Sequence, residues 1–179
     1  MAMRSLIDHG ADPNAEDWGK ATPLFYASEH GRLKATWLLL EHGADTNHRD
    51  EDGWSPLDRA SLGGHYDIAQ SLLDHGANVN SQHDYGWTSL HRASARGHTE
   101  VARLLLDRGA GVNTQNMDFW TPLHSAAYLG CLQVAKVLLK YGADLHIQNK
   151  GGKTPFQVAS ENGRDELAHL LSKHASEGT

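Results

Sequence analysis

One sequence unit returns every 33 residues along this chain, and no insertion interrupts the repeat. Its clearest mark is a short segment that begins with Thr or Ser and ends with Leu or Phe, found at 22–24, 55–57, 88–90, 121–123 and 154–156. A unit of this length cannot bury its own apolar face, so it has to stack on copies of itself. The period therefore predicts a solenoid, an architecture that commonly provides a binding surface.

Other positions keep the same frame and predict two helices in each unit. The Thr or Ser of each segment is expected to be an N-cap, and the proline that follows it suits the first helical position, although Ser89 replaces it once. Glycine can adopt the left-handed backbone that often follows a helix. Glycines are expected to end the second helices at Gly10, Gly43, Gly76, Gly109 and Gly142. Recurring small and apolar residues predict the core layers, at Ala27, Ala60, Ala93, Ala126, Ala159, Leu39, Leu72, Leu105, Leu138 and Leu171.

The unit resembles the ankyrin repeat, which has the same period and the signature Thr-Pro-Leu-His-x-Ala. The resemblance covers nearly the whole chain. It implies an all-α repeat solenoid, an ankyrin-like stack of helix pairs with β-hairpin fingers and a concave groove. The motif histidine is present only at His91 and His124, and Phe25, Asp58 and Gln157 take its place elsewhere. The motif therefore does not predict the loop hydrogen bonds of those three repeats.

We expect a single domain over residues 1–179. Its expected parts are a partial N-terminal repeat (1–12), full repeats (13–45, 46–78, 79–111 and 112–144), a C-terminal capping repeat (145–175) and a tail (176–179). The last repeat is expected to be a cap because Ser172 falls where the earlier repeats have leucine, which makes the final helix more polar. The N-terminal half repeat indicates a fragment of a larger scaffold or signalling protein.

Composition favours a cytoplasmic protein, with the nucleus as the alternative. The one cysteine, Cys131, cannot form an intrachain disulfide, which suits a reducing compartment. No apolar run reaches the ~20 residues of a membrane span, so no membrane partner is expected. The net charge of −6 disfavours nucleic acid as a partner, because that role usually requires clustered Lys and Arg. We expect a monomer.

The 13 histidines suggest a metal or catalytic site at first sight, but most of them sit at positions fixed by the repeat. The chain has no His-Glu-x-x-His segment, no paired cysteines and no glycine-rich phosphate loop. Its Ser, His and Asp residues lack the strained nucleophile turn that a catalytic triad uses. We therefore expect no enzymatic activity, no metal site and no cofactor.

The candidate partner-binding residues lie where the repeats differ from one another. Trp54, Trp87 and Trp120 share one column of the expected fingers, and Tyr85, Met117 and Phe119 flank them. Large aromatic residues on a solvent-facing edge are typical of interface anchors. The alternative is that each tryptophan ring packs on the neighbouring finger of its own chain.

Charged residues extend this candidate surface. Arg59 and Arg92 share a column of the first helices, and an arginine beside tryptophan suits recognition of carboxylate or aromatic groups. The alternative is that they pair with acidic fingers of their own chain, through Asp52 or Asp84. These two acids and Asp118 are also expected to steer the approach of a partner, since rim charges act mainly on association rate.

Tyr128 and Leu129, near the end of a first helix, complete the candidate surface. We expect a non-catalytic protein–protein interaction module that presents a preformed concave groove to a peptide or protein, because a rigid surface loses little entropy on docking. The alternative function is that of a substrate for an asparaginyl hydroxylase. Ankyrin-like repeats resemble known targets of that modification, and Asn47, Asn80 and Asn113 recur at the base of the fingers.

Overall fold

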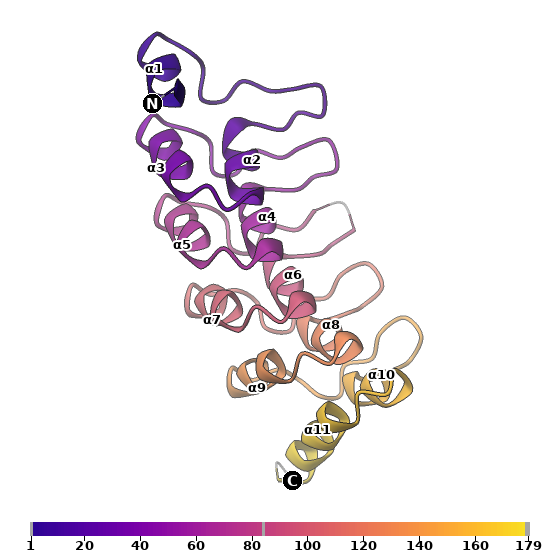
Figure 1. The fold of residues 1–179 in the computed structure, drawn as a ribbon. Helices are drawn as coiled ribbons and strands as arrows, with labels where there is room; N and C mark the ends of the chain where they lie inside the picture. Colours follow the sequence, from indigo (N-terminus) through magenta and orange to yellow (C-terminus); the bar gives the residue numbers. More distant parts are fainter. Residues whose placement is uncertain (1, 84, 178–179) are drawn as a thin grey trace.

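The computed structural model describes residues 2–83 and 85–177, which form a curved stack of helix pairs (Figure 1). The chain begins with α1 (Ala2–Asp8). The pairs that follow are α2 (Pro23–Glu29) with α3 (Leu33–Glu41), α4 (Pro56–Gly63) with α5 (Tyr66–Asp74), α6 (Ser89–Arg96) with α7 (Thr99–Asp107), α8 (Pro122–Leu129) with α9 (Leu132–Lys140), and α10 (Pro155–Glu161) with α11 (Asp165–Glu177). In Figure 1 the first helices form an inner row, most of the second helices lie to its left, and the fingers project to the right. The predicted helical repeat solenoid is confirmed.

Each first helix starts where the sequence predicts because a hydroxyl side chain caps it. This hydroxyl accepts the N–H of the third helical residue, at oxygen–nitrogen distances of 3.2 to 3.4 Å. The capping residues are Thr22, Ser55, Thr88, Thr121 and Thr154. Helix α6 starts in the same way with Ser89 in the proline position, so proline is not needed to set this boundary.

The core runs along the whole stack instead of gathering at one centre. The first helices contribute leucines that are at most 1% exposed, namely Leu24, Leu57, Leu90 and Leu123. The predicted leucine layer of the second helices is equally buried, at Leu39, Leu72, Leu105, Leu138 and Leu171. Alanines at the predicted positions are buried between neighbouring first helices, which allows their backbones to approach closely.

Gly64 lies in the turn between α4 and α5, and this position requires glycine for two reasons. Its φ of 72° is in the left-handed region, which favours glycine. A Cβ at this position would also lie 2.5 Å from Nδ1 of His98 in the next repeat. The His98 ring is held there because its Nε2 donates to the Leu62 carbonyl at 3.0 Å. One histidine therefore ties two repeats together and requires a glycine beneath it.

Other histidines have structural roles of the same kind. Nδ1 of His42 donates to the Leu38 carbonyl at 2.8 Å, one turn back in its own helix, and His9 and His75 make the equivalent bond. His65 ties its repeat to the preceding one as His98 does, through the Glu29 carbonyl at 3.2 Å. These bonds explain why histidine recurs at these positions, and the explanation does not involve catalysis.

The fingers differ from the expected β-hairpins, since the described part of the chain contains no strand. Each finger closes with a backbone bond such as the one from Asp50 N–H to the Trp54 carbonyl, at 3.1 Å. Asp50 Oδ1 also accepts the amides of Asp52 and Trp54, at 3.1 and 2.8 Å. A short carboxylate or amide side chain thus accepts hydrogen bonds from backbone N–H groups that would otherwise pair with a neighbouring strand. Neighbouring fingers are joined by isolated bonds, such as Met117 N–H to the Tyr85 carbonyl at 3.1 Å.

An asparagine at the base of each of the first four fingers ties it to the next repeat. Asn47 Nδ2 donates to the Gly76 carbonyl at 3.0 Å, and Asn47 Oδ1 accepts the Asn78 amide at 2.8 Å. The same pair of bonds recurs at Asn14, Asn80 and Asn113. Both ends of each side-chain amide are used, so these bonds explain why asparagine recurs with the repeat.

Candidate functional site

Arginines and aromatic rings alternate across three successive repeats on the finger side of the first helices. The Arg59 guanidinium lies 4.7 Å from the ring centroid of Phe25 and 4.4 Å from that of Trp54. The Arg92 guanidinium lies 4.1 Å from the Trp54 ring and 4.7 Å from the Trp87 ring. We call these five residues the aromatic–arginine ladder. A cation–π contact contributes about 0.5–2 kcal/mol, depending on desolvation, so the ladder stabilises the packing of the repeats.

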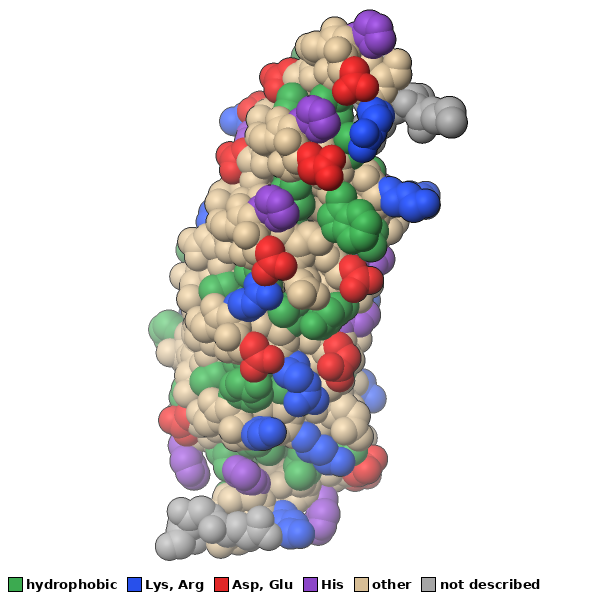
Figure 2. All heavy atoms as spheres, turned by 90° about the vertical axis from the view of Figure 1, so that its left-hand side faces the viewer, with side chains coloured by type: hydrophobic (Ala, Val, Ile, Leu, Met, Phe, Trp, Pro, Cys, Tyr) green, Lys and Arg blue, Asp and Glu red, His purple; other side chains and the backbone are tan. Residues whose placement is uncertain are grey.

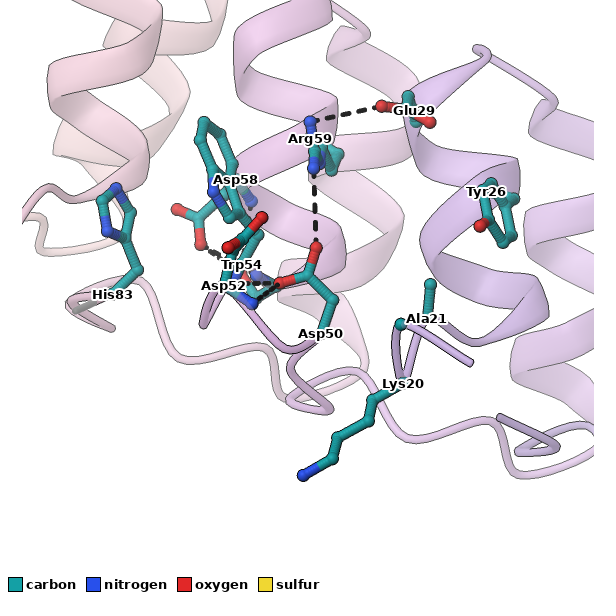
Figure 3. A network of polar contacts seen from close by, with 12 residues as sticks. Lys20, Ala21, Tyr26, Glu29, Asp50, Asp52, Trp54, Asp58, Arg59 and His83 are labelled. Atoms are coloured by element: carbon teal, nitrogen blue, oxygen red, sulfur yellow. Dashed lines mark hydrogen bonds and ion pairs between the residues drawn. The ribbon is translucent and has the colours of Figure 1, made fainter. Parts of the chain in front are cut away.

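Arg59 is paired with acids of its own chain (Figure 3). Its Nη1 lies 3.2 Å from Glu29 Oε1, and its Nη2 lies 3.5 Å from Asp50 Oδ2. The alternative in which this arginine pairs with a finger of its own chain is therefore observed. The acid involved is Asp50, at the base of the finger, and not the expected Asp52, whose side chain is exposed.

Arg92 occupies the equivalent place one repeat later but has no acidic partner among the described residues. The positions that match Glu29 and Asp50 are Leu62 and His83. Arg92 Nη2 donates to His83 Nε2 at 2.5 Å, whereas Nε is buried without a hydrogen-bond partner. Burial lowers the pKa of Arg92 and the nearby Asp58 carboxylate raises it. The guanidinium stays cationic because its ordinary pKa lies far above neutrality.

The three tryptophans of the predicted column are half-buried, and all of them contact their own chain. Trp54 stacks on His83, with ring centroids 5.1 Å apart and planes 16° from parallel. Trp120 packs edge to face on Tyr128 at a centroid distance of 5.7 Å. Trp87 contacts an arginine of the ladder. Packing within the chain is thus observed for each ring, and a partner-binding role for the column stays a prediction.

Apart from Trp18 in the first finger, the apolar finger side chains that are most open to solvent belong to the third and fourth fingers. Tyr85 is 69% exposed, Met117 63% and Phe119 52%. We call these three residues the tip cluster. Tyr128 and Leu129, at the end of α8, are also exposed. Exposed apolar groups gathered on one edge mark an interaction surface more often than single scattered ones do.

Phe119 is held in a strained backbone conformation. Its φ is 59°, in a column where Gly53, Gly86 and Gly152 have φ of 78°, 75° and 72°. Lys20, in the first finger, shares the column and the φ of 59°. The left-handed region is disfavoured by about 1–2 kcal/mol for a residue with a Cβ. Strain of this kind is often found at functional sites, so it supports the place of the exposed Phe119 ring beside the tryptophan column of the candidate surface.

The predicted acidic rim is only partly described. Asp52 and Asp118 are exposed, and Asp118 Oδ1 lies 3.9 Å from Lys150 Nζ, which is exposed as well. Ion pairs this open to solvent contribute little to stability. Asp84 lies outside the described residues.

Sequence comparison between the repeats missed two exposed tryptophans. Trp18, at the tip of the first finger, is fully exposed, and it falls in the same column as Met117. That shared column is a signal that could have revealed it. Trp37, on α3, is half-exposed and donates from Nε1 to Ser71 Oγ at 3.0 Å. Its column contains no second aromatic residue, so no such signal exists for it.

The opposite face, formed by the second helices, has a mixed character (Figure 2). Hydrophobic side chains form separate patches there, with charged side chains between them. Two of its acids tie one repeat to the next. Arg108 Nη1 lies 2.9 Å from Asp74 Oδ1, and the Tyr141 hydroxyl donates to Asp107. These two acids are therefore engaged by side chains of the following repeat.

Within the described residues, no group of three His, Cys, Asp or Glu side chains is placed to hold a metal ion. None of the described helices is long and apolar enough to cross a membrane. The free thiol of Cys131 is partly buried, and burial raises its pKa, which keeps it protonated and poorly nucleophilic.

Comparison with known families agrees with this architecture. The family model described as ankyrin repeats (3 copies) matches residues 1–83, 47–116, 80–149 and 116–179, which together span the chain. None of the curated proteins compared with the chain matches it.

Proposed function

The chain belongs to the ankyrin repeat family, and we propose that it is a non-catalytic module that presents a preformed concave groove to a peptide or protein partner. Ankyrin repeats are generic protein–protein interaction modules. The observation that carries the proposal is the tip cluster, in which Tyr85, Met117 and Phe119 expose apolar side chains on adjacent fingers.

Binding by such a surface depends on its rigidity. The fingers are held by hydrogen bonds between repeats, such as those of Asn80 and Asn113, and the first helices are linked through the ladder. A surface that is already ordered loses little conformational entropy when a partner docks. The exposed aromatic and methionine side chains then supply the anchors, since a few such residues usually dominate the affinity of an interface.

The wider setting is part of the same proposal. We place the module in a scaffold or signalling protein of the cytoplasm, with the nucleus as the alternative, and we expect it to act as a monomer. The net charge of −6 favours a protein partner over nucleic acid.

Affinity capture from a cell extract tests the proposal. The parent chain is compared with the double variant Tyr85→Ser, Met117→Ser, and each captured protein is purified and measured for direct binding. We expect the double variant to lose at least about tenfold in affinity, which corresponds to about 1.4 kcal/mol. Trp37→Ser, which removes an aromatic side chain from the opposite face, is the matched control and should bind as the parent does. Equal binding by the parent and the double variant would contradict the proposal.

A second candidate function is that of an asparaginyl hydroxylase substrate. Asn47 and Asn80 are exposed and Asn113 is half-buried, which favours access by an enzyme. Their hydrogen bonds to the next repeat already explain why they recur. Intact-mass measurement after co-expression with such an enzyme tests this function, because each modified site would add the mass of one oxygen atom.

A further inference from the structure

We propose that Arg92 is the point at which the groove binds a carboxylate of its partner, an Asp or Glu side chain of a docked peptide. The inference rests on the proposed function, since it names the chemistry recognised at one position of the same surface. The observations that carry it are the lack of an ion pair between Arg92 and any described residue, the contacts that hold its guanidinium, and a second copy of the same site that is already filled.

The filled copy is the site of Arg59. Two carboxylates, Glu29 and Asp50, lie 3.2 and 3.5 Å from its terminal nitrogens. The equivalent positions around Arg92 are Leu62 and His83, so both acids are missing while the cation is kept. The chain thus contains one arginine whose two terminal nitrogens are paired internally and a matching one that is open to an external acid, and Nε is buried without a partner in both.

The guanidinium of Arg92 is already oriented for a ligand. Trp54 and Trp87 lie 4.1 and 4.7 Å away, and His83 Nε2 accepts one of its N–H groups. Its Nη1 makes no hydrogen bond to a described residue and is not among the fully buried unpartnered atoms, so solvent reaches it. This nitrogen corresponds to the one that meets Glu29 in the Arg59 site. Aromatic neighbours reduce hydration and so strengthen a charge-assisted hydrogen bond.

The surroundings favour a carboxylate over a phosphate group. The ligands of the filled site are both carboxylates, each with a single negative charge. Asp58 lies close enough to Arg92 to act on it electrostatically and already offsets part of its positive charge. A phosphate near neutral pH carries about −1.5 to −2 charge, so it would be repelled more strongly by Asp58 than a carboxylate would.

The binding test uses N-acetylglutamate N-methylamide as the probe and the corresponding glutamine compound as its neutral match. Binding is followed by NMR through the side-chain N–H signals of Arg92, Trp54 and Trp87. We expect a saturable shift with the glutamate probe, with a dissociation constant on the order of millimolar, and no saturation with the glutamine probe. Arg92→Gln should abolish the shifts of the two indole signals.

Leu62→Glu keeps the whole ladder and restores the missing internal acid, so it tests the proposal without removing the arginine. We expect it to weaken binding of the glutamate probe at least tenfold, because the new carboxylate would occupy Arg92. Ala95→Glu is the matched control, since it adds the same charge one repeat later, where Ser125 replaces the arginine. This control should leave probe binding within about twofold of the parent, because salt screens an exposed charge that lies one repeat away from Arg92.

Several results would overturn the proposal. These are equal binding of the two probes, unchanged binding in Leu62→Glu, and tenfold tighter binding of a phosphoserine probe. Binding that appears only in Asp84→Asn would also overturn it, because Arg92 would then be paired within the chain. If a captured partner binds through the tip cluster but is insensitive to both Arg92→Gln and Leu62→Glu, the carboxylate site is wrong while the proposed function stands.

Discussion

Asp58 and Ser89 form a buried hydrogen bond between two successive repeats, in which Ser89 Oγ donates to Asp58 Oδ1 at 2.7 Å. Both residues depart from the repeat motif, because Asp58 replaces its histidine and Ser89 replaces its proline. In the next repeat, the motif histidine His91 donates from Nε2 to the Trp120 carbonyl at 2.9 Å. A carboxylate cannot donate a hydrogen bond, so it needs a donor from the next repeat, and proline has none. The two departures therefore compensate each other.

This pairing predicts that restoring the motif at one position alone is destabilising. Ser89→Pro should lower the free energy of unfolding by about 1–2 kcal/mol, because a buried carboxylate oxygen loses its partner. The double variant Asp58→His, Ser89→Pro should regain most of that loss, since the histidine could donate to the Trp87 carbonyl as His91 does to Trp120. Urea unfolding of the parent, both single variants and the double variant gives the coupling between the two positions. A coupling below about 0.5 kcal/mol would mean that the two substitutions are independent.

The capping histidines predict a loss of stability in acid. His91 Nδ1 accepts the Thr88 amide at 3.2 Å while Nε2 donates to Trp120, so the ring must be neutral. Burial lowers the pKa of His91 to about 4, and burial also lowers the pKa of His124. The unfolded chain binds these protons near pH 6.5, so the free energy of unfolding should fall as the pH drops from 6.5 towards 4. For His91 the fall is about 3 kcal/mol, at about 1.4 kcal/mol per pKa unit.

The measurement is urea unfolding at pH 7 and pH 4.5 for the parent and for the double variant His91→Gln, His124→Gln. Glutamine fits this place, because Gln157 Oε1 accepts the Thr154 amide at 2.8 Å in the last repeat. The double variant should lose clearly less stability between the two pH values than the parent does. Since all other titratable groups are shared, equal losses would show that these histidines do not carry the acid sensitivity.

The ladder predicts that its tryptophans differ in their importance for folding. Trp54 contacts both arginines and stacks on His83, whereas Trp87 contacts only Arg92 among the ladder residues. We expect Trp54→Ala to lower the free energy of unfolding by about 2–3 kcal/mol and Trp87→Ala by about 1–2 kcal/mol, less than for fully buried aromatic residues. Chemical denaturation of the two variants checks the order. The reverse order would mean that the ladder contacts contribute little.

Comparison of the repeats predicts what the repeats share, which is why the helix starts, the ending glycines and the core layers are where the sequence places them. It does not predict contacts in which both partners change together from repeat to repeat. A residue of the first helix meets the finger residue nine positions before it, in the pairs Tyr26 with Asp17, Arg59 with Asp50, and Arg92 with His83. The residue type varies along both the first-helix column and the finger column, so a search for residues that recur with the repeat does not detect these pairs.

The fingers show a second limit of sequence reasoning. The family resemblance implies β-hairpins, but the side chain at the position of Asp50 and Asn116 accepts two finger amides, which leaves isolated backbone bonds in place of strands. The strain at Phe119 could have been predicted from its column, since three of the other four members are glycine. The exposure of Met117 and Tyr85 could be expected from their place in a finger, whereas their direct backbone bond depends on how tightly adjacent fingers stack.

The strain at Phe119 predicts opposite effects on stability and on binding. Phe119→Gly should raise the free energy of unfolding by about 0.5–1 kcal/mol, because relief of the left-handed backbone outweighs the greater freedom of glycine in the unfolded chain. The same change removes a ring of the tip cluster, so affinity for the captured partner should fall at least fivefold, about 1 kcal/mol. Lys20→Gly is the matched control, since Lys20 has the same φ of 59° but lies on the first finger. It should stabilise the fold to a similar extent and leave affinity unchanged. If Phe119→Gly stabilises the chain and binds the partner as tightly as the parent does, the ring takes no part in recognition and the strain needs another explanation.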